Sequence, residues 1–258
     1  MTSIGIDYGT SNSEVVYFED GKPRMVQLDQ HSDTPNKIRS SVFIHFPNDL
    51  PLPPSEAVNA KVNQLKEKIT EQLNKAKEGY YQAKDPREQQ HYDKKITDLR
   101  GQFHHLPSLQ QKAIQLLMKD MTVEDFSLKR LVEHGEFAFG EDGFKRYLTT
   151  PDKGRLIYSP KNFLGANLIA GQQAAFVSLI AKQLSYFKQC AEQQLNKKIT
   201  GAVIGRPVRF HSTRGEDGNH QALDIMKKAA NEAGFDKVAF LEEPIAAAYH
   251  IESKLTSE

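Results

Sequence analysis

Ile4-Gly5-Ile6-Asp7-Tyr8-Gly9-Thr10-Ser11-Asn12-Ser13 is the segment from which the rest of this chain can be interpreted. Its first residues alternate apolar and small side chains, as in a β-strand, and reach Asp7, a carboxylate that this pattern predicts to be buried. The chain then turns and resumes as Glu14-Val15-Val16-Tyr17-Phe18, so the sequence predicts a β-hairpin. The dipeptide Asp20-Gly21 predicts a second hairpin turn.

The first turn has the properties of a phosphate-binding loop. Gly9 has no Cβ and allows the backbone to approach a ligand closely. The amides of such a turn form a concave nest for anions, and the hydroxyls of Thr10 and Ser11 can donate to the same phosphate oxygens. Asp7 is a hard oxygen ligand suited to Mg²⁺ or to its bound waters. Asp-x-Gly-Thr also occurs in ordinary turns, so alone it favours a phosphate loop only slightly.

The composition of the chain limits which kinds of partner and which cellular compartment are expected. At 258 residues the chain can bury the core of one large domain or two small ones. With 34 Lys and Arg against 33 Asp and Glu, no overall field attracts nucleic acid or anionic lipid, so neither is expected as a partner. No apolar run is long enough for a transmembrane helix, and because the first strand begins within three residues of Met1 no signal peptide is expected. The single cysteine, Cys190, is predicted to be a small core residue, which fits a reducing, cytoplasmic compartment.

A helical insertion is predicted at about residues 50–134. Between Ser55 and Lys84 apolar residues recur at three- and four-residue steps, which predicts an amphipathic helix that Asp85-Pro86 ends. A second helix follows, then a third that Ser108 can N-cap, and a short fourth helix from Thr122-Val123-Glu124-Asp125 to about Glu133. Acids and bases are interspersed here, so a solvated surface is favoured over a basic coiled-coil arm. The apolar positions of the first helix are Val58, Val62, Leu65, Ile69, Leu73 and Ala76.

Strands and helices alternate in the second half of the chain. Strands are predicted at 136–139, 155–158, 201–205 and 237–241, in addition to an earlier one at 40–46. Helices are predicted at 173–196 and 220–232, with Ala233-Gly234 as the cap of the latter. A last helix opens at Pro244. This order predicts an α/β fold with parallel strand pairing in its second half.

Three further segments, taken in order with the opening hairpin, resemble the DnaK-type, seventy-kilodalton heat-shock chaperones. Val203-Ile204-Gly205-Arg206-Pro207-Val208-Arg209-Phe210 resembles their strand followed by Val-Pro, and Ser159-Pro160-Lys161-Asn162-Phe163-Leu164-Gly165 resembles their Lys-Arg-Leu-Ile-Gly segment. Leu241-Glu242-Glu243-Pro244-Ile245-Ala246-Ala247-Ala248 resembles their Asn-Glu-Pro-Thr-Ala-Ala-Ala connecting helix. The match covers residues 2–46 and about 137–252. Within the family, the chain resembles the divergent bacterial branch called YegD, which also carries a long helical insertion early in the chain.

The resemblance implies the N-terminal lobe of an actin-like, ribonuclease-H-like ATPase domain that uses ATP or ADP and Mg²⁺. It implies that Asp7 holds the Mg²⁺ water shell and that Lys161 approaches the transferred phosphoryl group. Glu243 would orient the attacking water or the metal shell. Pro207 would be the switch that reports nucleotide state to a client-binding domain. The residues expected to bind the phosphates are Gly9, Thr10, Ser11 and Asn12.

The residues themselves leave alternatives open. Lys161 could be a surface lysine after a proline, Glu243 an acid stabilised by a helix N-terminus, and Pro207 the end of a strand. The chain also departs from the family pattern. The loop after Phe210 is longer and more polar, and the arginine that partners the switch proline cannot be placed, Arg214 being a weak candidate. The helix after Ala248 continues as Tyr249-His250 where the family tends towards Tyr-Gly.

Residues 1–258 contain no second Asp-x-Gly-Gly-Gly-Thr hairpin and no glycine-rich adenosine motif. The expectation is one lobe of a longer protein that is a slow, Mg-dependent ATPase, with the lobe alone inactive because half a cleft loses most of its affinity. An unfolded client polypeptide would then bind through the missing C-terminal part, and co-chaperones are possible partners. Two competing classes share the opening hairpin: a filament-forming actin relative of the bacterial shape-determining type, and a metabolite kinase of the same superfamily.

Overall fold

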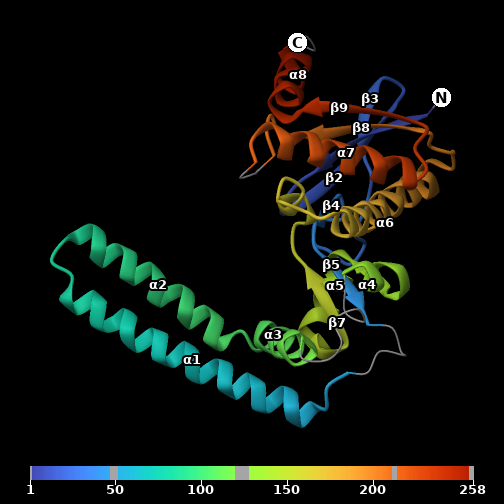
Figure 1. The fold of residues 1–258 in the computed structure, drawn as a ribbon. Coiled ribbons are helices and arrows are strands. Elements are labelled where there is room, and N and C mark those ends of the chain that lie inside the picture. Colours follow the sequence, from blue (N-terminus) through green and yellow to red (C-terminus); the bar gives the residue numbers. More distant parts are fainter. Residues whose placement is uncertain (1, 47–51, 120–127, 211–213, 256–258) are drawn as a thin grey trace. The chain divides into compact units, whose positions relative to one another are not determined.

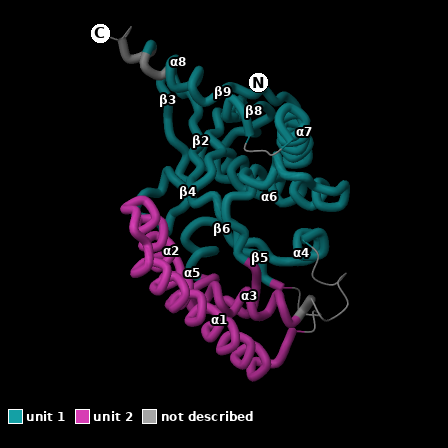
Figure 2. Tube along the Cα trace, turned by 60° about the vertical axis from the view of Figure 1, so that its left-hand side comes forward, with its two compact units in different colours: residues 1–45, 128–145, 156–258 teal, residues 46–127, 146–155 magenta. Residues whose placement is uncertain are grey.

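The structure of the protein is a computed structural model that describes residues 2–46, 52–119, 128–210 and 214–255 (Figure 1). The architecture is mixed α/β, which confirms the predicted fold class at that level. The chain divides into two compact units (Figure 2). Residues 1–45, 128–145 and 156–258 form the first unit, and residues 46–127 and 146–155 form the second. Within the described ranges, no helix combines the length and the apolar character needed to cross a membrane.

The N-terminal segment of the first unit folds as the predicted hairpins. Strand β1 (Ser3–Tyr8) pairs antiparallel with β2 (Asn12–Glu19), and β2 pairs antiparallel with β3 (Lys22–Met25). Asp20 and Gly21 have φ values of 51° and 75°, and two successive positive φ values define the type I′ turn that Asp-Gly favours. Both hairpin predictions are therefore confirmed.

The central sheet of the first unit continues through parallel strands. Strand β8 (Gly201–Arg206) pairs parallel with β1, and β9 (Lys237–Glu242) pairs parallel with β8. The resulting order is β3-β2-β1-β8-β9, with β4 (Lys37–Arg39) paired to β2. The predicted parallel pairing of the second half is confirmed. Because β1, β8 and β9 run in one direction, their carboxyl ends lie at the same edge of the sheet.

Helix α6 (Ala170–Leu195) lies against the sheet face that carries Ile4, Ile6 and Tyr8. The rings of Tyr8 and Phe187 are 6.5 Å apart, and α6 packs in turn against α7 (Glu216–Glu232). Helix α7 begins at Glu216 rather than near residue 220, because its acidic first turn suits the positive end of the helix dipole. It ends as predicted, with Gly234 at a φ of 84°. Helix α8 (Glu243–Leu255) follows β9 directly.

A smaller group of elements completes the first unit. Strand β5 (Val42–His45) pairs antiparallel with β6 (Glu136–Phe139), a strand whose bounds match the prediction. Helix α4 (Leu128–His134) precedes β6, and α5 (Gly140–Thr149) follows it, with its residues from Arg146 onward assigned to the second unit. Strand β7 (Gly154–Ile157) lies one residue earlier than predicted and spans the boundary between the two units.

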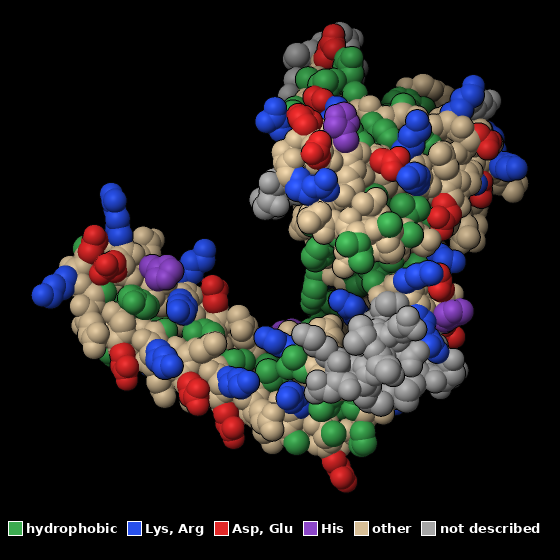
Figure 3. Space-filling view, viewed as in Figure 1, with side chains coloured by type: hydrophobic (Ala, Val, Ile, Leu, Met, Phe, Trp, Pro, Cys, Tyr) green, Lys and Arg blue, Asp and Glu red, His purple; other side chains and the backbone are tan. Residues whose placement is uncertain are grey.

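The second unit contains three of the predicted helices. Helix α1 (Ser55–Gln82) packs against α2 (Pro86–His104) and α3 (Leu106–Lys119). All but one of the six apolar positions predicted for α1 are buried, Leu73 being half-buried. Between α1 and α2, the Asp85 carboxylate accepts a hydrogen bond from the Arg87 amide at 2.8 Å and caps α2. Charges of both signs are interspersed on the visible surface of α1 and α2 (Figure 3).

The predicted start of the third helix is wrong. Helix α3 begins at Leu106 with Pro107 in its first turn, a position where a missing N–H costs nothing, so Ser108 lies inside the helix. The Ser108 amide donates to His105 Nδ1 at 3.2 Å, so His105 takes the capping role that was expected of Ser108. The helix start predicted at Thr122-Val123-Glu124-Asp125 lies outside the described residues.

Candidate functional site

The carboxyl ends of the parallel strands bring the predicted site residues together. Ile6 lies opposite Ile204 in the ladder, which places Asp7 beside Gly205, and a Cβ built on Gly205 would lie 3.8 Å from Asp7 Oδ1. Glu243 directly follows the last residue of β9. Ligands of sheets with parallel strands bind at this edge, because loops from several strands converge there. The sheet therefore supplies two carboxylates at one edge, from residues 236 positions apart.

Lys161 reaches this edge from the connection between β7 and α6. It lies in a short 3-10 helix, Pro160–Phe163, and is only 6% exposed. Its Nζ donates to the Tyr8 carbonyl oxygen at 2.6 Å and to Glu243 Oε1 at 2.7 Å. An ammonium group has three donors, so one remains after these two contacts among the described residues. Lys161 is thus not a surface lysine, and it joins the β1–β2 turn to the end of β9.

Asp7 is exposed, so the prediction that it is buried is wrong. Alternation along β1 sends Ile4, Ile6 and Tyr8 to the face covered by α6 and Asp7 to the opposite face. Partial burial of its carboxylate still raises the pKa of Asp7 above its ordinary value. The Lys161 ammonium opposes this rise, and the Glu243 carboxylate adds to it. These mutual effects place the three charges in one electrostatic neighbourhood.

The turn from Gly9 to Asn12 is held by its main chain. A Cβ on Gly9 would lie 2.1 Å from the Asn12 carbonyl oxygen, so the turn itself requires glycine here. The Ser40 amide donates to the Ser11 carbonyl at 2.9 Å, and the Ser159 hydroxyl donates to the Thr10 carbonyl. Ser159 has a φ of 44°, an uncommon value for a residue with a side chain.

The side chains of this turn point to solvent. Thr10, Ser11 and Asn12 are all exposed, and the hydroxyls of Thr10 and Ser11 have no protein partner within the described ranges. An anion that reaches the turn therefore finds donors that are not engaged with the protein. These residues lie next to Tyr8, whose carbonyl Lys161 contacts.

Among the described residues, Pro207 is not one of the polar contacts of Lys161 or Glu243. It follows β8, and Arg206 Nη1 donates to the carbonyls of Pro207 and Val208 at 3.1 and 3.2 Å. Arg206 Nη2 also contacts Glu242 Oε1 at 2.6 Å, so one guanidinium links the carbonyls of Pro207 and Val208 to the last residue of β9, which directly precedes Glu243. Arg214, the weak sequence candidate for this role, donates instead to Gln221 Oε1.

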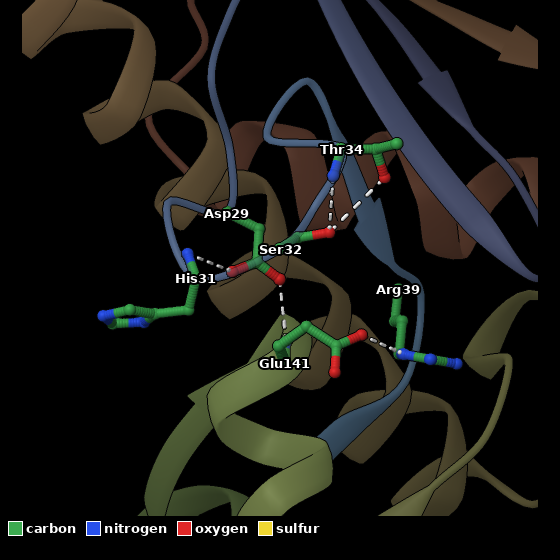
Figure 4. A network of polar contacts seen from close by, with 6 residues as sticks. All are labelled: Asp29, His31, Ser32, Thr34, Arg39 and Glu141. Atoms are coloured by element: carbon green, nitrogen blue, oxygen red, sulfur yellow. Dashed lines mark hydrogen bonds and ion pairs between the residues drawn. The ribbon is translucent and has the colours of Figure 1, made fainter.

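A polar pocket of about 500 Å³ borders the turn on the side of Asn12 and β4. Asp29 is buried in its wall and accepts hydrogen bonds from the amides of His31 and Glu141 at 3.2 and 2.7 Å (Figure 4). Arg39 pairs with Glu141 at 2.6 Å. Neither Lys161 nor Glu243 lines this pocket. Of its charged groups, Arg39 and Glu141 are paired with each other, while Lys37 is paired with Glu14, which does not line the pocket.

Sequence reasoning missed the residues that support the turn from beneath. Gln183 is 1% exposed, accepts from the Tyr8 hydroxyl at 2.5 Å and donates to the Ser40 carbonyl at 3.1 Å. The Ser13 and Ser40 hydroxyls are 2.9 Å apart and fully buried. The one feature of the sequence that could have indicated this network is a glutamine inside the apolar face of α6, between Ile180 and Leu184.

Mg²⁺ was the metal expected at Asp7. The described residues contain no group of three or more His, Cys, Asp or Glu side chains that could hold a metal ion by themselves. Mg²⁺ characteristically binds one or two carboxylates and takes its other ligands from water and phosphate. Asp7, an exposed carboxylate beside the β1–β2 turn, fits that mode, and an all-protein metal cage is not required.

Comparisons with known proteins support the resemblance to heat-shock chaperones at the level of the family. No protein-family model matches the sequence. The chain is 35% identical over 130 residues to a chaperone protein HscA homolog of Rickettsia felis, and 31% identical over 160 residues to one of Rickettsia akari. It is 30% identical over 139 residues to the chaperone protein DnaK of Mycoplasmopsis pulmonis. These matches cover 48%, 56% and 50% of this chain.

The matched regions are small parts of those relatives, at 17%, 24% and 21% of their lengths in the same order. The chain therefore spans about a fifth of the curated proteins that it resembles. Two of these relatives are HscA homologs and one is a DnaK, and each match covers about half of this chain. This similarity supports a relationship to the DnaK-type, seventy-kilodalton heat-shock chaperones.

Proposed function

We propose that this chain is the N-terminal lobe of an actin-like nucleotide-binding domain in an ATP-dependent, DnaK-type chaperone. The observation that carries the proposal is the buried Lys161, which bridges the main chain of the β1–β2 turn and Glu243. A buried ammonium beside a turn with exposed Thr10 and Ser11 suits the phosphates of a nucleotide. The similarity to HscA and DnaK proteins supports the chaperone class.

In the proposed reaction, the turn from Gly9 to Asn12 holds the phosphates of ATP. Glu243 orients a water molecule whose oxygen bonds to the terminal phosphorus as the bond to the ADP oxygen breaks. Lys161 stabilises the negative charge that spreads over the phosphoryl oxygens, and its burial strengthens that effect because water does not screen it. Glu243 in turn keeps the ammonium in place before substrate arrives.

Asp7 would hold the water shell of Mg²⁺. The ion would neutralise charge on the phosphate oxygens when it is bound. Asp7 is suited to this role because it is exposed at the sheet edge, and its raised pKa reports a carboxylate that lacks full compensation for its charge. A cation at this position would provide that compensation.

The coupling of nucleotide state to client binding is also part of the proposal. Arg206 links Glu242 to the carbonyls of Pro207 and Val208, so a shift at the end of β9 would be transmitted to the Pro207 segment. A client polypeptide, co-chaperones and a cytoplasmic location follow from the chaperone class. We also propose the assignment to the YegD branch, which the early helical insertion at about residues 50–134 supports.

Two alternatives remain within the same superfamily. A filament-forming actin relative shares the opening hairpin and a Glu-Glu-Pro-Ala-Ala-Ala run, and ATP-dependent sedimentation would identify it. A metabolite kinase shares Asp-x-Gly-Thr-Ser, and ADP release that depends on a small hydroxylated substrate would identify that. The similarity to chaperones favours neither of them.

Titration of the ¹⁵N-labelled chain with Mg·ATP tests the nucleotide site directly. The amides of Gly9, Thr10 and Ser11 should shift, and they should shift less in Asp7→Ala when Mg²⁺ is present. Shift perturbation detects the millimolar binding expected of half a cleft. No shift at these amides at several millimolar Mg·ATP would reject the proposed site.

The role of Lys161 has a separate test in the intact protein. Lys161→Ala should abolish ATP turnover while nucleotide binding survives, because the ammonium acts on charge that develops during the reaction. Lys228→Ala is the matched control, since Lys228 forms an exposed pair with Asp224 on α7. Normal turnover in Lys161→Ala would reject the assigned role.

A further inference from the structure

A buried polar network lies beneath the β1–β2 turn. The Tyr8 hydroxyl donates to Gln183 Oε1 at 2.5 Å, and Gln183 Nε2 donates to the Ser40 carbonyl at 3.1 Å. The Ser40 and Ser13 hydroxyls are 2.9 Å apart. All four residues are at most 1% exposed, so water cannot replace these bonds.

The network holds the turn at both of its ends. Tyr8 is the last residue of β1 and Ser13 lies at the start of β2, so they flank the segment from Gly9 to Asn12. Ser40 also contacts the middle of the turn, where its amide donates to the Ser11 carbonyl at 2.9 Å. Gln183 of α6 is the residue that connects these contacts, because one carboxamide serves both Tyr8 and Ser40.

The carboxamide is matched to its two partners. Its oxygen accepts from a phenol and its nitrogen donates to a carbonyl, which no apolar side chain of similar size can do. Burial raises the pKa of Tyr8, so its hydroxyl stays protonated and remains a donor. Removal of the carboxamide would leave the Tyr8 hydroxyl and the Ser40 carbonyl buried without partners.

We propose that Gln183 is a positioning residue that orders the β1–β2 turn for phosphate binding, acting through Tyr8 and Ser40. The proposal rests on the proposed function for the ligand, but the ordering itself can be measured without nucleotide. Gln183 touches no part of the expected ligand. Its effect passes through the main chain of the turn that Tyr8, Ser40 and Ser13 hold in place.

Gln183→Met and Gln194→Met form a matched pair for the test. Gln194 is on the same helix and bonds the Gln27 main chain at 2.9 and 2.8 Å, away from the turn. Backbone ¹⁵N relaxation at Gly9 to Asn12 and hydrogen exchange of the Ser40 amide are measured for both variants at equal fraction folded. Gln183→Met should lower the order parameters of the turn and speed Ser40 exchange about tenfold relative to Gln194→Met. Tyr8→Phe, which keeps the ring and loses one bond, should give a smaller change of the same kind and replaces Gln183→Met if that variant does not fold.

The outcomes separate this inference from the proposed function. A turn as ordered in Gln183→Met as in the parent, or equally loosened in Gln194→Met, would overturn the inference. If the turn loosens only in Gln183→Met and the affinity for Mg·ATP falls about tenfold, both proposals are supported. If the turn loosens but even the parent does not respond to Mg·ATP, the nucleotide site is wrong and the ordering role of Gln183 stands.

Discussion

Asp7 carries a charge that lowers the stability of the fold. Partial burial, with a smaller contribution from Glu243, raises the pKa of Asp7 above the ordinary 3.8 despite Lys161. A carboxyl group whose pKa is raised by folding binds its proton more tightly in the folded state. Ionisation of Asp7 therefore lowers the free energy of unfolding as the pH rises from 3.8 through the raised value.

Asp7→Asn should accordingly stabilise the chain at pH 7 and have little effect at pH 3, where the carboxyl group is protonated in both states. The gain should be less than about 1 kcal/mol, because Asp7 is exposed and solvent screens its charge. Urea denaturation at the two pH values measures it, with exposed Asp33→Asn as the control. A loss of stability at pH 7 would show that attraction to Lys161 outweighs desolvation.

At this scale the sequence could identify residues but not their contacts. Lys161 and Glu243 stand 82 positions apart, and only the resemblance of two segments to one family suggested that they meet. Alternation along β1 was visible, yet Asp7 was assigned to the buried set although it is out of phase with Ile4 and Ile6. The role of Gln183 was not predicted, because the sequence around a polar residue in an apolar helix face does not indicate which residue it contacts.

Among the elements, the loop before β4 is attached to α5 by one carboxylate. Asp29 accepts from the amides of His31 and Glu141, and a Cβ on Gly140 would lie 2.2 Å from its Oδ2. Asp29→Ala should lower the free energy of unfolding by about 2–4 kcal/mol, because two charge-assisted bonds are lost in a buried place. Urea denaturation tests this, with exposed Asp33→Ala from the same loop as control. An equal, small loss in both would contradict it.

Strands β8 and β9 are joined at their ends by Arg206 and Glu242. These side chains are 22% and 30% exposed, so their 2.6 Å contact is shielded better than a surface pair. A double-mutant cycle of Arg206→Ala and Glu242→Ala should give a coupling free energy of about 1 kcal/mol. The exposed pair Lys228–Asp224 should give about 0.3–0.5 kcal/mol in the same measurement. Equal coupling free energies in the two cycles would contradict the proposal that Arg206 connects the end of β9 to Pro207 and Val208.

Element types followed from the sequence more reliably than element ends. Three-four periodicity in 55–84 and alternation in 4–8 depend on repeated burial, so one misjudged residue does not change them. The start of α3 depended on a single choice between Ser108 and Pro107, and His105 supplied a cap that the sequence did not suggest. The start of α7 was predicted too late because Gly215 and Gly218 are typical of a loop, although Glu216 and Asp217 favour a helix N-terminus.

For the molecule as a whole, the division into two units implies unequal local stability. The first unit contains the five strands in order β3-β2-β1-β8-β9, in which β1 and β8 are central and paired on both sides. The second depends on helices, of which α1 buries five residues along 28 positions. Cooperative units with fewer buried apolar contacts open at lower free energy.

Hydrogen exchange of the whole chain should therefore show α1 and α2 opening at a lower free energy than β1 and β8. Leu65→Ala tests whether this lower opening free energy reflects the packing within the second unit or only the difference between helices and strands. Leu65 is buried on α1, and its loss should lower the opening free energy of α1 by about 2–3 kcal/mol through the cavity left behind. Half-buried Leu73→Ala should have a smaller effect on the same helix. Because β1 and β8 belong to the other unit, their protection should not change in either variant. A parallel fall in all four elements would mean that the chain opens as one cooperative body, and that any signal between the units travels through global stability.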